Sequence, residues 1–149
     1  MRKKVVHLLI ILIVLSLFGC SSAPGISTPL TINGIELQVI SASLHKSYMI
    51  GSQEYSPSAS GDLLLLVRAQ LTSSGEDIDL GDWKAQVQDG NGRISNSDIQ
   101  SKITGTIEGR EGTFLEWFFV VDEDAQQLSL NIGEHEIDLS SILNKGSEE

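Results

Sequence analysis

Apolar and polar residues alternate along much of the chain after residue 29, and this period of two is that of a β-strand, not a helix. Seven segments show alternation or a short apolar run between turn residues: 35–39, 63–71, 83–88, 102–108, 113–121, 128–132 and 136–139. No segment carries a sustained helical stripe, and we expect at most one helical turn, at Ser140–Leu143. About seven short strands with turn signals between them predict an all-β fold, an antiparallel β-sandwich.

Turn residues support this reading between 89 and 92. Asp89-Gly90-Asn91-Gly92 contains both an Asp-Gly and an Asn-Gly pair, which are strong signals for a tight connection between two antiparallel strands. We therefore predict a hairpin here.

The segment Leu44–Gly61 breaks the strand-turn rhythm, and we expect a long loop that is functional or mobile.

The most hydrophobic segment of the expected domain, Thr113–Val121, is predicted to be a central strand. Because Glu116 points to the opposite side, the core face takes Leu115, Trp117 and Phe119, and the second face takes Phe114, Phe118 and Val120. Apolar residues on both faces require a cover for the second face. The cover is either the Leu44–Gly61 loop or the chain end, or else a docked partner protein. On the last reading, the candidate interaction residues are Tyr48, Tyr55 and Phe118.

The first twenty residues have the layout of an export signal. Arg2, Lys3 and Lys4 precede the mostly apolar run Val5–Phe18, which is shorter than the roughly 20 residues of a spanning helix. The tetrad Leu17-Phe18-Gly19-Cys20 resembles the lipobox of bacterial lipoproteins, which implies cleavage before Cys20 and a diacylglyceryl anchor on its thiol. The alternatives are an ordinary signal peptide with an incidental cysteine, and a short uncleaved anchor.

This interpretation divides the chain into four parts. Residues 1–19 are the signal peptide, 20–29 the lipidated cysteine and a flexible Ser/Pro/Gly-rich tether, 30–143 the sandwich domain, and 144–149 a disordered tail. Cys20 is the only cysteine, so the domain must be stable without a disulfide. The expected location is the extracytoplasmic face of the cell membrane or outer membrane.

Charge narrows the choice of partners. The chain carries ten basic and twenty acidic side chains, a net charge of −10. Removing Arg2, Lys3 and Lys4 with the signal peptide leaves seven basic side chains and a net charge of −13. The remaining Lys and Arg are scattered, whereas phosphate backbones need them clustered, so we exclude nucleic acid as a partner.

Candidate chemistry is sparse. Glu76, Asp77, Asp79 and Asp82 lie in one acidic run that offers oxygen ligands for Ca²⁺, although its spacing matches no EF-hand. The competing interpretation is a solvated acidic loop. The mature chain has two histidines, His45 and His135, which argues against a zinc site of three or four ligands. We expect Asp122-Glu123-Asp124 to keep the preceding apolar strand soluble.

Three motifs follow one another between Gly61 and Leu143: Leu65-x-Val67-x-Ala69-x-Leu71 with Ser73-Ser74-Gly75-Glu76, then Val87-x-Asp89-x-x-Gly92, then Glu108-Gly109 through Trp117-x-Phe119-x-Val121 to Leu128-x-Leu130. With these motifs the stretch resembles the telokin-like, immunoglobulin-like domain of many bacterial lipoproteins, a family of unknown function. The resemblance implies an immunoglobulin-like topology and lends no catalytic residues. The sequence departs from the family at Ser73 and Glu108, where Asn and Pro are usual.

Together these features predict a lipid-anchored, non-enzymatic binding module of the cell envelope whose ligand is a protein, a glycan or another envelope component. One alternative is a calcium-dependent module that uses the Glu76–Asp82 loop. The other is an envelope hydrolase, which would require a histidine, a carboxylate and a serine to converge in one cleft.

Overall fold

The computed structural model describes residues 26–72, 83–107 and 109–144, which form an all-β domain. The described strands are β1 (Leu30–Ile32), β2 (Ile35–His45), β3 (Tyr48–Ile50), β4 (Gln53–Tyr55), β5 (Asp62–Thr72), β6 (Ala85–Gln88), β7 (Ile94–Asn96), β8 (Ile99–Ile107), β9 (Arg110–Asp122), β10 (Ser129–Ile132), β11 (His135–Asp138) and β12 (Leu143–Asn144). Among these residues there is no helix long and apolar enough to cross a membrane.

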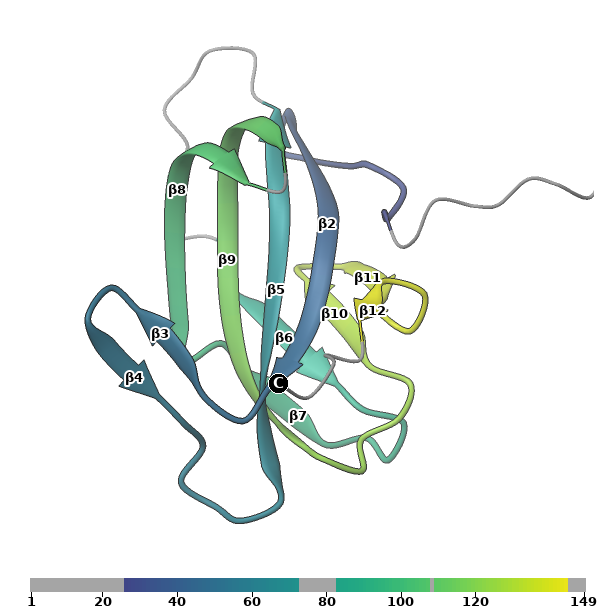
Figure 1. The fold of residues 1–149 in the computed structure, drawn as a ribbon. Helices are drawn as coiled ribbons and strands as arrows, with labels where there is room; N and C mark the ends of the chain where they lie inside the picture. Colours follow the sequence, from purple (N-terminus) through teal and green to yellow (C-terminus); the bar gives the residue numbers. More distant parts are fainter. Residues whose placement is uncertain (1–25, 73–82, 108, 145–149) are drawn as a thin grey trace, which may run out of the picture.

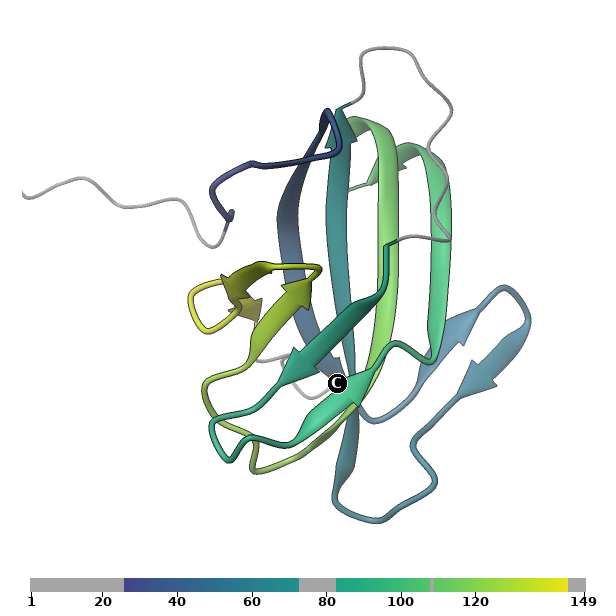
Figure 2. The same cartoon turned by 180° about the vertical axis from the view of Figure 1, so that it is seen from behind.

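The strands form two packed sheets and a separate hairpin (Figure 1). The larger sheet has the order β1-β2-β5-β9-β8, and β12 pairs in parallel with β2. The smaller sheet has the order β11-β10-β6-β7 and lies behind the larger one in Figure 1, in front of it in Figure 2. The third sheet is the β3–β4 hairpin, which stands to one side of the sandwich.

The core fills the space between the two large sheets, as expected for a β-sandwich. The larger sheet contributes alternate residues of β2, β5 and β9, including Val67 and Trp117, which are fully buried. The smaller sheet contributes Val87, Leu130 and Ile137 from β6, β10 and β11. The face assignment along β9 is confirmed, because Leu115, Trp117 and Phe119 belong to this core. Phe114 and Phe118 do not belong to it and are buried on the outer face of the sheet.

The seven predicted segments each correspond to an observed strand, and the predicted hairpin at Asp89–Gly92 is confirmed. Asp89 N donates to Arg93 O at 3.0 Å, and Gly92 N donates back to Asp89 O at 2.9 Å. The Asp89 carboxylate also accepts from the backbone N–H groups of Asn91 and Arg93 at 2.9 and 2.8 Å. Its side chain therefore replaces the ladder bonds that the turn lacks.

The structure corrects the sequence interpretation in the Leu44–Gly61 segment. The Leu44–Gly61 segment is not simply a loop, because β2 runs to His45 and β3 and β4 form a hairpin with Tyr48 opposite Tyr55. The single helical turn expected at Ser140–Leu143 is present, because Leu143 N donates to Leu139 O at 2.8 Å before the chain enters β12. Strands of two or three residues are too short for alternation to reveal them, which explains why five strands were missed.

The domain also begins earlier than residue 30. Ser27, within the predicted flexible tether, donates its backbone N–H to Val39 O at 3.0 Å. Its hydroxyl accepts from Val39 N at 2.9 Å, and its carbonyl accepts from the Gln38 side chain at 3.0 Å. Ser27 thus extends the edge of the larger sheet beside β2.

A β-bulge explains why the apolar–polar alternation ends at Val39 although β2 continues to His45. The register between β2 and β5 shifts between Val39 and Ser41, so Ile40 is an extra residue. Before the bulge, odd-numbered residues such as Leu37 face the core, and after it the even-numbered Ala42 does. Ser43 and His45 consequently lie on the outer face.

Candidate interaction site

A partly buried ion pair crosses the centre of the larger sheet on its outer face. Arg68 of β5 and Glu116 of β9 are direct cross-strand neighbours, and Arg68 Nε lies 2.7 Å from Glu116 Oε1. Their side chains are 22% and 10% exposed. A carboxylate this buried requires a charged hydrogen-bond partner, because an unpaired charge would be expensive to remove from water.

The same guanidinium holds the base of the β3–β4 hairpin. Arg68 Nη2 donates to the Tyr48 hydroxyl at 2.8 Å. The Tyr48 ring also packs against Phe118, with ring centroids 5.3 Å apart, and edge-on against His45 at 5.1 Å. Tyr48 therefore joins the hairpin to β2, β5 and β9 with both its apolar ring and its polar end.

His45 completes this arrangement from the end of β2. Its Nε2 lies 2.8 Å from the Ser43 hydroxyl. Partial burial lowers the pKa of His45 below its usual value, and the nearby positive charge of Arg68 lowers it further. The imidazole is thus biased toward its neutral form. We refer to Ser43, His45, Tyr48, Arg68, Glu116 and Phe118 as the outer-face cluster.

The two faces of the hairpin differ in exposure. Tyr48, Ile50 and Tyr55 are half-buried, and the cross-strand pair Tyr48–Tyr55 lies on the side that contacts the sandwich through Tyr48. The opposite side carries the pair Met49 and Glu54, which are exposed. Met49 is 55% exposed, one of the few large apolar side chains on the described surface. The hairpin therefore presents Met49 to solvent from an anchored base.

The cluster brings a serine, a histidine and a carboxylate onto one surface, which the hydrolase alternative requires. Ser43 and His45 are within hydrogen-bond reach, but the contact that positions Glu116 is with Arg68. In a catalytic triad the carboxylate instead orients the histidine from its other ring nitrogen. These contacts describe a structural support for Tyr48.

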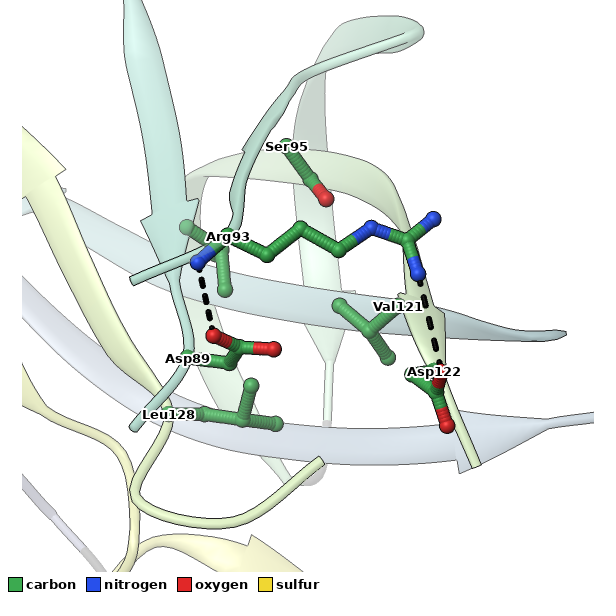
Figure 3. Close-up of a pocket in the computed structure, with 7 residues that line it drawn as sticks. Asp89, Arg93, Ser95, Val121, Asp122 and Leu128 are labelled. Carbon is green, nitrogen blue, oxygen red and sulfur yellow. Dashed lines mark hydrogen bonds and ion pairs between the residues drawn. The ribbon is translucent and has the colours of Figure 1, made fainter. Parts of the chain in front are cut away.

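A second polar grouping surrounds Arg93 at the end of the sandwich (Figure 3). A shallow hollow here is lined by Val87, Asp89, Arg93, Ser95, Val121, Asp122 and Leu128, and it encloses no space large enough for a water molecule. Arg93 Nη1 lies 3.7 Å from a carboxylate oxygen of both Asp62 and Asp122. Its side chain is 48% exposed, so these pairs contribute little to stability. The hollow has no room for a small ligand.

The structure brings some of the predicted site residues together, and others lie outside the described part of the chain. Tyr48 and Phe118 are in contact and Tyr55 is the cross-strand neighbour of Tyr48, but Phe118 is only 2% exposed and cannot itself form a contact surface. Cys20 and the acidic residues Glu76, Asp77, Asp79 and Asp82 lie outside the described residues. Within the described ranges, no three His, Cys, Asp or Glu side chains gather as a metal site would require.

Arg68 and Glu116 were missed as members of a site. The available signal was a charged residue at an outward position in each of the two most apolar strands, because two such residues of opposite sign can pair across neighbouring strands. The pairing of β5 with β9 was needed to use it.

No protein-family model, curated protein or solved structure matches this chain.

Proposed function

We propose that this chain is a lipid-anchored lipoprotein of the cell envelope whose immunoglobulin-like sandwich binds a protein or glycan partner through the β3–β4 hairpin. Binding involves no chemical conversion of the partner. The observation that carries this proposal is the anchored hairpin, which presents Met49 to solvent while Tyr48 holds its base against Arg68 and Phe118.

The physical argument concerns the hairpin's marginal stability. A two-stranded sheet of three-residue strands does not hold its shape alone in water. The contacts of Tyr48 therefore keep the hairpin in a defined position beside the sandwich. A pre-positioned surface loses less conformational entropy on binding than a mobile loop does, which favours recognition.

Features of the first twenty residues support the proposed lipid anchor. The tetrad Leu17-Phe18-Gly19-Cys20 after an apolar run resembles a lipobox. Attachment through two acyl chains holds a protein stably on a membrane, whereas one chain holds it only marginally. Without Arg2, Lys3 and Lys4 the anchored chain has a net charge of −13 and gains nothing from anionic headgroups, so the acyl chains must carry the attachment.

Lipidation is tested by growing cells that express the chain with an alkyne palmitate analogue. We expect labelled protein in the membrane fraction for the wild type and none for Cys20→Ala. If the wild type takes up no label, or if Cys20→Ala is labelled equally, the anchor is refuted.

Binding through the hairpin is tested by placing a photo-crosslinking amino acid at Met49 of the full chain in intact cells. The matched control places it at Lys84, an exposed residue next to β6 of the other sheet. We expect one discrete adduct from position 49, none from position 84, and loss of the position-49 adduct when Tyr48→Ala releases the hairpin. Equal adducts from both positions would refute the hairpin as the binding surface.

A further inference from the structure

The two edges of the larger sheet differ in how they are covered. On one side, β1, Ser27 and β12 pair in turn with β2 and cover it in short pieces from Ile35 to Ser43. On the other side, β8 is nine residues long and pairs with β9, and no other described strand lies beside it. β8 is the last strand of the larger sheet at that edge, and the β3–β4 hairpin extends past its lower end in Figure 2. Long edge strands are templates for pairing with another chain unless they are shortened or blocked.

The sequence of β8 is complementary to itself in one antiparallel register. If two copies pair with Ile103 opposite Ile103, then Ile99 lies opposite Ile107 of the other copy. All three isoleucines are half-buried and share the outer face of the sheet, since Ile99 and Ile103 pair with Phe118 and Phe114 of β9. This register therefore places isoleucine against isoleucine three times and continues the apolar row formed by Phe114 and Phe118.

Charge also fits this register. Lys102 is the one charged residue of β8, and it lies opposite Thr104 of the other copy, so the two lysines do not face one another. Lys102 and Thr104 are exposed on the inner side of β8. Like charges directly opposite would destabilise the pair of strands, whereas a lysine opposite a threonine does not.

We propose that two copies of this chain associate through antiparallel pairing of β8 with β8, in the register that places Ile103 on the twofold axis. The interface is isologous, because the same strand serves both copies. Pairing joins the two β8 strands through backbone hydrogen bonds. The six-stranded sheets of the two copies then join into one continuous sheet. This inference is independent of the lipid anchor and of the hairpin surface.

A charge introduced at position 104 tests the register, because specific pairing and general charge repulsion predict opposite changes in the dimer Kd. In the proposed register, Thr104→Glu faces Lys102 of the other copy twice per dimer, and Thr104→Lys creates two like-charge pairs. We expect the dimer Kd to fall for Thr104→Glu and to rise for Thr104→Lys, by roughly 2- to 30-fold in each direction. General repulsion between copies predicts the reverse, because an added lysine makes the net negative charge of each copy smaller and an added glutamate makes it larger.

The measurement is sedimentation equilibrium of the full chain in density-matched detergent. The matched controls are Thr31→Glu and Thr31→Lys, at an exposed threonine of β1 on the other edge of the sheet. We expect the dimer Kd of these two control variants to change only as the net charge of the chain changes. The proposal is overturned if the wild type remains monomeric at all concentrations, or if the Thr104 variants follow net charge as the Thr31 variants do.

Cysteine crosslinking in cell membranes tests the register directly. Ile103→Cys should give an oxidant-dependent dimer band beyond that of the wild type, which contains Cys20 alone. Thr31→Cys, exposed on β1 at the opposite edge of the sheet, should give none. Equal bands from positions 103 and 31 contradict the register. A single Ile103→Cys adduct of a different mass contradicts the self-pairing and points to a strand from another protein.

Discussion

The Arg68–Glu116 pair is expected to behave as a coupled unit in unfolding experiments. Glu116→Leu leaves Arg68 without its carboxylate, and Arg68→Met leaves Glu116 without its guanidinium. Breaking a buried pair costs about 3–5 kcal/mol. Because the two side chains are 22% and 10% exposed, water partly compensates, and we expect a loss of about 2–3 kcal/mol in the free energy of unfolding for each single variant.

The double variant Arg68→Met/Glu116→Leu should lose less than either single variant, about 0–1 kcal/mol, because two apolar side chains of similar length then face one another. The assay is urea unfolding of the four proteins. With a slope of about 2 kcal/mol per M urea, each single variant should shift the midpoint by about 1–1.5 M.

Arg68 also donates to Tyr48, so the cycle is repeated in a Tyr48→Phe background, which removes that contact. A coupling energy of at least 1.5 kcal/mol should remain there. If the losses of the two single variants simply add in the double variant, the pair does not stabilise the sheet as the structure indicates.

Three further predictions concern the hairpin, pH and the Asp89 turn. Tyr48→Phe should speed amide hydrogen exchange in the hairpin, because it removes the hydrogen bond to Arg68. Tyr55 has no described side-chain hydrogen bond, so Tyr55→Phe should leave the exchange unchanged. Equal effects of the two variants would contradict the anchoring role of Tyr48. Because the folded pKa of His45 is lowered, the unfolded chain binds more protons below pH 6.5, so stability should be full above that pH and fall as the pH drops toward the folded pKa. His45→Gln should flatten this slope in pH-dependent urea unfolding, and His135→Gln, at an exposed position, should not. Asp89→Ala should lower the free energy of unfolding by about 1–3 kcal/mol, because the backbone N–H groups of Asn91 and Arg93 lose the buried carboxylate that accepts from both. A loss under about 0.5 kcal/mol would contradict this.

The alternation of apolar and polar residues was sufficient to predict the main strands and the inward face of β9. Side chains in a strand point alternately to opposite faces, so Glu116 between Leu115 and Trp117 determines which residues enter the core. The Asp-Gly and Asn-Gly pairs likewise specified the turn after Gln88. Both inferences depend on a few neighbouring residues, and local physical chemistry is enough for them.

Only the tertiary structure determined which residues meet. The bulge at Ile40 changes the parity of β2, and this places Ser43 and His45 on the outer face. Arg68 and Glu116 are 48 residues apart in sequence and become neighbours because β5 lies beside β9. The place of β8 at the edge of the described sheet also depends on strand order, because the sequence of a strand does not state whether it lies inside a sheet or at its margin. Local pattern sets the faces of each strand, whereas register and strand order arise from packing of the whole chain.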